Sequence, residues 1–220
     1  MIILTGSSGG IGMEIAKPLS EIESLFALSN IHEPAFADGE KLDITNIQEI
    51  KKFVDKNKKE LSHITLIHLA AVKIDELAVF CNEINWDKVM DVNLKGAFFL
   101  TRELLPIMTK EKWGRIIFII SAGLGDVGTL TYSTSKFGLL GMSEVLSKEY
   151  ARFGITSNIL QLGYFDAGLY KKLPEDKQKE LLEQIPSRKL GDPINIVNAI
   201  EFIIKSDFVN GAILNIDGGI

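Results

Sequence analysis

The fold is decided by the first twelve residues, which read Met1-Ile-Ile-Leu-Thr-Gly-Ser-Ser-Gly-Gly-Ile-Gly12. A short apolar run predicts a buried strand, and the glycines after it predict a tight turn into a helix. Gly6 would let the chain turn off the strand, Gly10 would let backbone N–H groups approach a phosphate, and Gly12 would let the helix pack against the sheet. The first turn of that helix would then attract an anion. Since such turns also occur as plain strand-to-helix connections, this segment alone favours a nucleotide pyrophosphate site without establishing one.

Apolar, β-rich runs recur along the rest of the chain and alternate with amphipathic segments. This alternation predicts an α/β protein with a Rossmann-type, doubly wound parallel sheet and helices on both faces. We expect strands over 2–4, 25–28, 64–68, 115–120, 156–161 and 212–216, and helices over 10–20, 47–57, 86–108, 131–152, 175–184 and 193–204. Between the second strand and Asp43 the chain is short and contains Pro34 and Gly39, which predicts a loop or a single turn in place of a crossover helix.

The composition is that of an ordinary globular protein. The 220 residues are 46% hydrophobic and 24% charged, with a formal net charge of −5, so we expect one domain over 1–220 and no affinity for nucleic acid or for an anionic membrane surface. No apolar run reaches membrane-spanning length, and the first residues do not resemble a signal peptide. Cys81 is the single cysteine, which excludes an internal disulfide and a cysteine metal cluster. These features predict a cytoplasmic protein without a metal site.

Four polar residues have the chemistry of a catalytic site. Tyr132 and Lys136 are four residues apart in a predicted helix, which places both side chains on one face. A nearby ammonium favours the phenolate over a phenol of pKa ~10, so we expect the pair to exchange protons with a substrate oxygen. Ser121 ends the strand over 115–120 and is expected at the carboxyl edge of the sheet, where open α/β folds bind ligands. Asn93 is a polar residue in an amphipathic helix and needs a partner if it is buried.

Each of these residues also has a purely structural interpretation. Tyr132 could be an interface aromatic, Lys136 a solvated helix residue, Ser121 a capping hydroxyl and Asn93 a satisfied core amide. Their order along the chain, after a nucleotide-binding turn, is what favours the catalytic interpretation.

With these residues in place, the chain resembles the short-chain dehydrogenase/reductase family, specifically its single-domain branch. Thr5-Gly-Ser-Ser-Gly-Gly-Ile-Gly12 matches the family pattern T-G-x-x-x-G-I-G, and Tyr132-Ser-Thr-Ser-Lys136 matches Y-x-x-x-K. The resemblance continues through Asp43 to the segment Asn210-Gly-Ala-Ile-Leu-Asn-Ile-Asp217-Gly-Gly, which looks like the terminal strand and turn of bacterial 3-oxoacyl-carrier-protein reductases.

The resemblance implies hydride exchange between a nicotinamide cofactor and a carbonyl or alcohol carbon. Tyr132 would be the general acid or base, Lys136 would lower the Tyr132 pKa and hold the nicotinamide ribose, Ser121 would bind the reacting oxygen, and Asn93 would hold a water that relays protons through Lys136. The cofactor contacts implied by the same resemblance are Gly6, Ser8, Gly10, Ile11, Gly12, Asn30, Asp43, Ile44, Ala70, Tyr132, Lys136, Gly163 and Phe165.

The chain departs from the family pattern at three places. His68-Leu-Ala-Ala71 replaces the usual Asn-Asn-Ala-Gly and is closer to the branch that modifies sugar nucleotides; we interpret His68 as a strand-end residue bonded to backbone. Leu162-Gly163 replaces Pro-Gly, and Ala167 occupies the position of a threonine that contacts the nicotinamide amide. The loop from Ser121 to Tyr132 is about two residues shorter than usual, which should alter the substrate pocket more than the chemistry.

The choice between the two nicotinamide dinucleotides depends on the residues that end the second strand. A carboxylate there binds the adenosine ribose and repels a 2′-phosphate, whereas an arginine attracts the phosphate. The chain has Ser29-Asn30 and Ile31-His32, so neither signal is present. Because Ser7, Ser8 and Asn30 could donate hydrogen bonds to a phosphate, NADP(H) is slightly favoured over NAD(H).

The substrate is expected to be a small molecule bound by the segment over 163–190. Phe165, Leu169, Tyr170 and Leu173 could form an apolar lid or could pack as core. A 3-oxoacyl-carrier-protein reductase, a sugar-nucleotide-modifying enzyme and a non-catalytic NAD(P)-sensing protein remain alternatives. The resemblance also implies a homodimer or homotetramer that pairs through the helices over 86–108 and 131–152.

Overall fold

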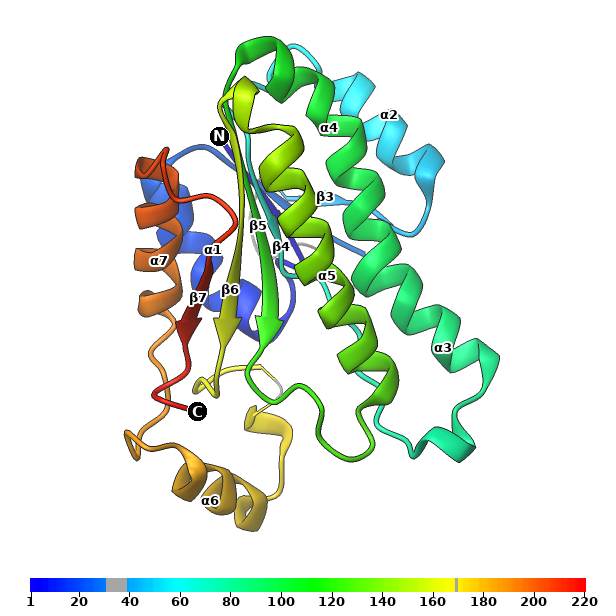
Figure 1. Cartoon of the computed structure of the whole chain (residues 1–220), viewed down its shortest axis with the longest axis vertical. Coiled ribbons are helices and arrows are strands. Elements are labelled where there is room, and N and C mark those ends of the chain that lie inside the picture. The colour runs from blue at the N-terminus through cyan, green and yellow to red at the C-terminus, as the bar shows by residue number, and fades with distance from the viewer. Residues whose placement is uncertain (31–38, 169) are drawn as a thin grey trace.

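The computed structural model describes residues 1–30, 39–168 and 170–220, and its strands form one parallel sheet (Figure 1). Within the described residues, the sheet has seven strands in the order β3-β2-β1-β4-β5-β6-β7. Their bounds are β1 Ile2–Thr5, β2 Leu25–Ser29, β3 Glu40–Lys41, β4 Thr65–His68, β5 Gly114–Ser121, β6 Ile155–Leu162 and β7 Ile213–Ile216. The predicted Rossmann-type, doubly wound α/β fold is therefore confirmed.

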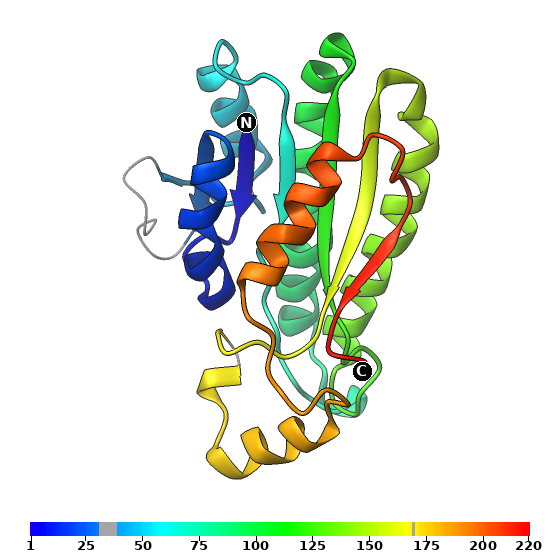
Figure 2. The same cartoon turned by 90° about the vertical axis from the view of Figure 1, so that its left-hand side faces the viewer.

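Helices cover both faces of this sheet. Their bounds are α1 Gly10–Ile22, α2 Ile47–Asn57, α3 Glu83–Met90, α4 Ala97–Glu111, α5 Leu130–Glu149, α6 Glu175–Gln184 and α7 Ile194–Lys205. Figures 1 and 2 show α1 and α7 on one face and α2, α4 and α5 on the other, while α6 lies below the sheet, beyond the ends of the strands.

The core has two parts because both faces of a parallel sheet are buried. Ile2 and Leu4 of β1 pack on the α1/α7 side, whereas Ile3 between them packs on the α2/α4/α5 side. Successive side chains of a strand point to opposite faces of the sheet. Because both faces are buried, apolar residues follow one another in a strand without alternating with polar ones, which explains the continuous apolar runs in the sequence.

The order of the strands creates the ligand crevice. β1 pairs with β2 on one side and with β4 on the other, so the chain reverses its direction across the sheet between β1 and β4. Open α/β sheets bind ligands at this reversal, outside the carboxyl ends of the strands. The glycine-rich turn that follows β1 lies at this point.

The predicted helix over 86–108 is not one continuous α-helix. The structure has α3, then a π-helical turn over Asp91–Gly96, then α4. A side chain at Gly96 would collide with Ile44, which lies within 2.9 Å of the position that a Cβ would take. Periodicity in the sequence did not reveal this widened turn. Such π-helical turns are frequent at functional sites.

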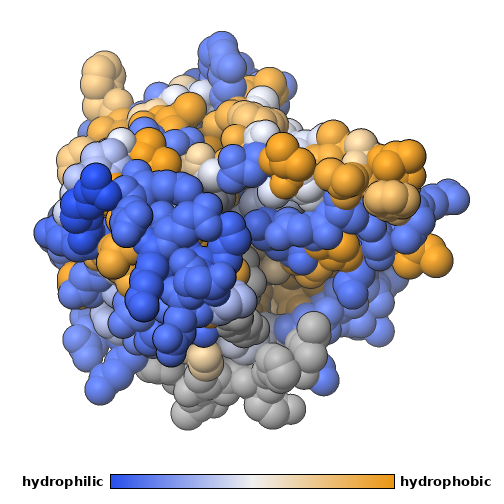
Figure 3. Space-filling model, turned by 90° about the horizontal axis from the view of Figure 1, so that it is seen from below, coloured by the Kyte–Doolittle hydropathy of each residue, from blue (hydrophilic) through white to orange (hydrophobic). Residues whose placement is uncertain are grey.

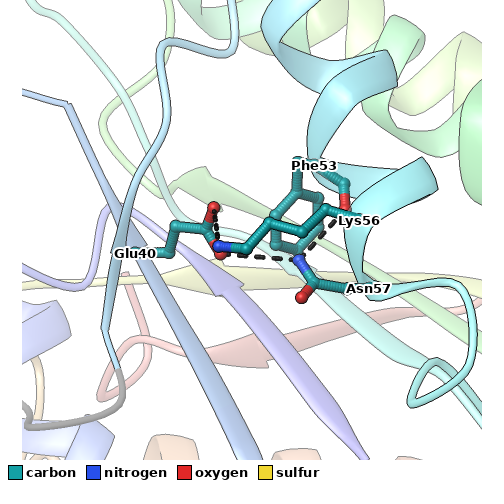
Figure 4. Close-up of polar contacts among 4 residues, drawn as sticks. All are labelled: Glu40, Phe53, Lys56 and Asn57. Atoms are coloured by element: carbon teal, nitrogen blue, oxygen red, sulfur yellow. Dashed lines mark hydrogen bonds and ion pairs between the residues drawn. The ribbon is translucent and has the colours of Figure 1, made fainter.

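The sequence also missed the two-residue strand β3. Glu40 forms an ion pair with Lys56 at 3.0 Å and accepts a hydrogen bond from the Asn57 side chain at 3.4 Å (Figure 4). These contacts connect the end of α2 to β3, which pairs with β2. The connection predicted to be a loop, with Pro34, lies outside the described residues.

None of the helices in the described part of the chain is long and apolar enough to cross a membrane. Among the same residues, no group of three or more His, Cys, Asp or Glu side chains is arranged to hold a metal ion.

Candidate active site

The glycine-rich turn after β1 is built from backbone groups in close contact. Gly6 has φ +74°, and a Cβ on it would lie 2.7 Å from the backbone of Ala70. A Cβ on Gly12 would collide with the Gly6 carbonyl oxygen. Only glycine satisfies these two positions, which confirms the tight turn predicted at Gly6 and shows that Gly12 packs against the turn itself.

Two hydroxyl groups fix this turn to the neighbouring strands. The Thr5 hydroxyl oxygen accepts hydrogen bonds from the backbone N–H groups of Leu69 and Ala70, both at 3.2 Å, which ties the segment after β4 to the turn. The buried Ser7 hydroxyl donates to the Leu28 carbonyl at 3.0 Å. The expectation that Ser7 could donate to a cofactor phosphate is therefore wrong, because its proton is already committed to β2.

Helix α1 begins at the turn with an open N-terminus. Gly9 is the N-cap residue and supplies no side-chain hydrogen bond, so the first backbone N–H groups, those of Gly10 and Ile11, have no capping oxygen. Ser8 is half-buried beside them. This end of α1 has the unpaired donors and the positive dipole that an anion requires.

The loop after β6 rests on the same turn. A Cβ on Gly10 would collide with the backbone of Gly168, which itself has φ +61°. Two glycines therefore allow two backbones to meet above the start of α1. We predicted that Gly10 permits a close approach to a phosphate. In this structure it is the backbone of the loop after β6 that approaches Gly10 closely.

The predicted pair on α5 lies at the carboxyl edge of the sheet. Tyr132 is in the first turn of α5 and is half-buried, and the Lys136 ammonium lies 5.8 Å from the centroid of its ring. Lys136 is only 2% exposed and donates to the Ile119 carbonyl of β5 at 2.8 Å. The alternative of a solvated helix residue is therefore excluded for Lys136.

Ser121 lies on β5 two residues after Ile119, whose carbonyl oxygen accepts the Lys136 hydrogen bond. It is the last residue of β5 and pairs in register with Leu162 at the end of β6. Within the described residues, neither the Ser121 hydroxyl nor the Tyr132 hydroxyl makes a hydrogen bond. Both oxygens are thus available to a ligand at the edge of the sheet.

The electrostatics of the pair differ from the expectation drawn from spacing. Burial lowers the pKa of Lys136 to about 8. Burial, followed by the negative charge of Asp75, raises the pKa of Tyr132 to about 12, so the prediction of a lowered pKa is wrong for the protein without ligands. The physical reason is that burial removes water from around the Tyr132 phenol and so disfavours its ionised form. Burial also disfavours the charged form of Lys136.

Asn93 lies in the π-helical turn, and three hydrogen bonds hold its side chain. Its side-chain oxygen accepts from the Val72 N–H at 2.7 Å, and its amide nitrogen donates to the Val72 carbonyl at 2.9 Å and to the Ser135 hydroxyl at 3.0 Å. Both amide protons are therefore used, and the implied role of holding a relay water is not open to them. The side chain instead joins the segment after β4 to α5.

His68 lies at the end of β4, but its partner is not the backbone as expected. Its Nε2 is 2.8 Å from the Thr101 hydroxyl of α4, and its ring stacks on Phe118 with centroids 4.9 Å apart. Burial, with a smaller contribution from the Lys136 charge, lowers the pKa of His68 to about 3. The imidazole is therefore a neutral core group.

The residues expected near the adenosine are only partly described. Asn30 is exposed beyond the end of β2, and Ile44 is buried with its side chain in the core. The Asp43 carboxylate accepts hydrogen bonds from the N–H and the hydroxyl of Thr45, at 2.9 and 2.8 Å. Ile31 and His32, which bear on the choice of cofactor, lie outside the described residues.

The segment after β6 forms the other side of the crevice. Gly163 packs against the backbone of Asp217, and Phe165 is 2% exposed with its ring against Gly191. Tyr170 is also buried, so Phe165 and Tyr170 pack as core and do not form the lid that was one of their two interpretations. Leu169 lies outside the described residues.

Figure 3 views the carboxyl edge of the sheet and shows a hollow between a hydrophilic lobe and an opposite rim where hydrophobic residues gather. The lobe corresponds to α6, which has no buried residue. The exposed large hydrophobic side chains on the segments after β4 and β5 are Leu77, Val79, Phe80 and Val127.

Two charged residues beside Tyr132 were missed by the sequence analysis. The Lys73 ammonium lies 5.8 Å from the centroid of the Tyr132 ring and 3.1 Å from the Asp75 carboxylate. The only sequence signal was their position just after β4, in the segment that crosses the edge of the sheet. Nothing in the sequence showed that this segment runs beside the start of α5.

Known proteins share this sequence and this fold. A model of the short chain dehydrogenase family matches residues 1–178. The 3-oxoacyl-[acyl-carrier-protein] reductases FabG of Rickettsia felis and of Thermotoga maritima are each 32% identical to the chain, over 99% of it and over 95% and 96% of their own lengths. Nodulation protein G of a Rhizobium species is 32% identical over 99% of the chain and 95% of its own length.

A solved structure from Agrobacterium tumefaciens, assigned as a gluconate dehydrogenase, superimposes with a TM-score of 0.89. The superposition covers 100% of this chain and 94% of the Agrobacterium chain, at 24% sequence identity. This likeness shows a shared fold. The family match, together with the glycine turn and the Tyr132–Lys136 pair, gives one conclusion. The chain belongs to the short-chain dehydrogenase/reductase family and is an NAD(P)-dependent oxidoreductase.

Proposed function

We propose that one domain, residues 1–220, transfers a hydride between a nicotinamide cofactor and the carbonyl or alcohol carbon of a small molecule, with Tyr132 as the proton donor or acceptor. The observation that carries this proposal is the position of the Tyr132 phenol and the Lys136 ammonium, one helical turn apart on α5. Lys136 also contacts the strand that ends at Ser121, through the Ile119 carbonyl. The segment over 163–190 would contact the substrate.

The residues at the edge of the sheet fit a dinucleotide. The uncapped start of α1 suits a pyrophosphate, and the close backbone packing at Gly6 and Gly12 holds the turn that leads into it. The further cofactor contacts that we propose are Ser8, Gly10, Ile11, Asn30, Asp43, Ile44, Ala70, Gly163 and Phe165. Because Gly168 rests on Gly10, we infer that the loop after β6 shifts when the pyrophosphate enters.

The nicotinamide ring, when bound, supplies or accepts the hydride. In reduction, Tyr132 would donate its proton to the substrate oxygen, while the Ser121 hydroxyl would hold the same oxygen by a hydrogen bond. Lys136 would stabilise the phenolate that remains and would bind the ribose hydroxyls. Since its pKa is about 8, Lys136 carries its charge at neutral pH.

Asn93 would act as a positioning residue in this mechanism. Its amide holds Val72 and Ser135 in place, so it fixes the segment after β4 against the face of α5 that carries Lys136. This role needs no water held by the amide group.

The direct test is Tyr132→Phe, with Tyr150→Phe at the end of α5 as the matched control. We expect Tyr132→Phe to lower turnover by ~10²–10⁴-fold while cofactor affinity changes little, because a general acid acts mainly in the transition state. Turnover would be followed with a panel of ketones and alcohols and with both cofactors. Unchanged turnover in Tyr132→Phe would refute the proposal.

We infer a slight preference for NADP(H) over NAD(H). The absence of a carboxylate in Ser29-Asn30 and the exposed Asn30 amide support it, with Ser8 as a further donor. Titration of the protein with the two reduced cofactors decides the question. A preference of tenfold or more for NAD(H) would be inconsistent with this inference.

Reduction of a 3-oxoacyl group is a second candidate, suggested by the FabG relatives. The observation that favours it is the exposed apolar rim of Leu77, Val79, Phe80 and Val127 at the edge where Tyr132 lies. An acyl chain would cover such a rim. Turnover that rises with acyl chain length would support this substrate class, and equal turnover of short and long chains would exclude it.

We propose a homodimer or homotetramer that pairs through α4 and α5. Phe98 on α4 and Phe137 and Val145 on α5 are 42%, 51% and 52% exposed, which is unusual for large apolar side chains on long helices unless another surface covers them. Light scattering at micromolar concentration tests this assembly, and a monomer would exclude it.

A further inference from the structure

The segment after β4 places a second ammonium group against the Tyr132 ring. Lys73 and Lys136 lie at the same distance, 5.8 Å from the ring centroid, and they come from different elements. Lys73 also forms an ion pair with Asp75, with 3.1 Å between its Nζ and the carboxylate oxygen. The phenol therefore has one buried cation on its own helix and an exposed pair of opposite charges on the neighbouring segment.

Both ends of this segment are fixed, so the charged pair does not drift freely along the edge. Val72 donates its N–H to the Asn93 side-chain oxygen at 2.7 Å and accepts a hydrogen bond from the Asn93 amide nitrogen at 2.9 Å. Glu76 donates its N–H to the Gly128 carbonyl at 2.8 Å and forms a β-bridge with Thr129, just before α5. Lys73 and Asp75 lie between these two anchors.

We propose that Lys73 and Asp75 are opposing positioning residues for Tyr132: the ammonium attracts negative charge on the phenol oxygen, and the carboxylate repels it. This inference rests on the proposed role of Tyr132 as the proton donor or acceptor. It adds two residues to the machinery of the reaction and assigns them opposite effects.

The charges that face Tyr132 make the sign of each effect definite. They are Lys136 on α5 and the Lys73–Asp75 pair on the segment after β4, and the Asp75 charge already contributes to the raised pKa of Tyr132. The Lys73 and Asp75 side chains are 33% and 55% exposed, so water screens them and each effect is modest. We expect removal of either charge to shift the ionisation of Tyr132 by about half a pH unit, which is roughly a threefold change in the equilibrium.

The experiment measures the fraction of Tyr132 that is ionised, in the full chain without ligands. Ultraviolet difference absorbance of tyrosinate is recorded at one alkaline pH below the onset of unfolding, with Tyr132→Phe as the blank because the chain has four tyrosines. Circular dichroism at that pH verifies that each variant is folded. The variants are Asp75→Asn, Lys73→Met, the double variant, and Lys73→Arg as the charge-conserving control.

We expect the ionised fraction to rise roughly threefold in Asp75→Asn and to fall roughly threefold in Lys73→Met. Lys73→Arg and the double variant should remain close to the unmodified protein. Changes in the same direction, a change in only one of the two single variants, or no change in either would overturn the proposal. Because this measurement needs no turnover, a failure here is distinct from a failure of the proposed function, which only the Tyr132→Phe activity test addresses.

The pH dependence of kcat/KM for alcohol oxidation gives a second readout. In this direction kcat/KM should rise with pH as Tyr132 ionises in the free enzyme. We expect this rise to occur at lower pH in Asp75→Asn and at higher pH in Lys73→Met. A purely structural role for either residue would lower the rate at every pH and leave the position of this rise unchanged.

Discussion

Replacing Asn93 by alanine separates its positioning role from simple stability. The side chain makes three hydrogen bonds, two to Val72 and one to Ser135, and it is 1% exposed. A neutral hydrogen bond contributes about 1 kcal/mol net, and a buried group left without a partner costs about 1–3 kcal/mol. We therefore expect Asn93→Ala to lower the free energy of unfolding by about 3 kcal/mol.

Asn158 offers a matched control at a distance from the site. It is fully buried, and its amide also bridges backbone, donating to the Val209 carbonyl at 2.8 Å and accepting from the Ala212 N–H at 3.0 Å. With two bonds in place of three, Asn158→Ala should lower the free energy of unfolding by about 2 kcal/mol. Urea unfolding monitored by circular dichroism measures both values.

Activity is what distinguishes the two variants. Asn93→Ala releases the segment after β4 from α5, so we expect turnover to fall at temperatures where the variant is still folded. Asn158→Ala should keep its turnover under the same conditions. A loss below about 1 kcal/mol in Asn93→Ala, or an equal loss of activity in both variants, would refute the argument that Asn93 positions the site.

Three further predictions concern groups that the structure describes closely. His68 stays neutral in the folded protein because its pKa is about 3 and not 6.5, so the unfolded state gains protons first as the pH falls. Stability should decline between these values by up to about 1.4 kcal/mol per pH unit, and His68→Gln should remove this decline in urea titrations. The pKa of Lys136 is about 8 in the folded protein and 10.5 for a free lysine, so between these pH values the unfolded state binds more protons than the folded state. Stability should therefore rise as the pH increases above about 8, an increase that Lys136→Met should abolish in the same assay. Gly10→Ala would drive a Cβ into Gly168 and should destabilise the protein by about 1–3 kcal/mol, whereas Gly141→Ala, with nothing within 4 Å, should not; equal unfolding midpoints for the two would contradict the packing.

Much of the site followed from local patterns. The turn at Gly6 and the pairing of Tyr132 with Lys136 depend on backbone conformation and on helical spacing, which neighbouring residues specify. Ser121 followed from its place at the end of an apolar strand, because the carboxyl ends of parallel strands share one edge. These three inferences needed no knowledge of contacts between distant segments.

Other features depended on contacts that the sequence does not encode locally. The hydroxyl of Ser7 looked available until β2 was seen to accept its hydrogen bond, and Asn93 looked able to hold a water until Val72 and Ser135 were found to use its amide. The charged residues Lys73 and Asp75 were ordinary loop residues in the sequence. Each of these outcomes was set by a partner from another element of the fold.

The βαβ order, the glycine turn and the residue types of the site could be inferred from the amino-acid sequence alone, because they depend on period, on φ and on short spacing. Which of those groups have free hydrogen-bonding capacity, and how their charges act on one another, became apparent only in the folded protein. The reason is that desolvation and Coulomb forces depend on separation in space, and segments far apart in the chain, such as those after β4 and at the start of α5, meet only when the sheet has formed.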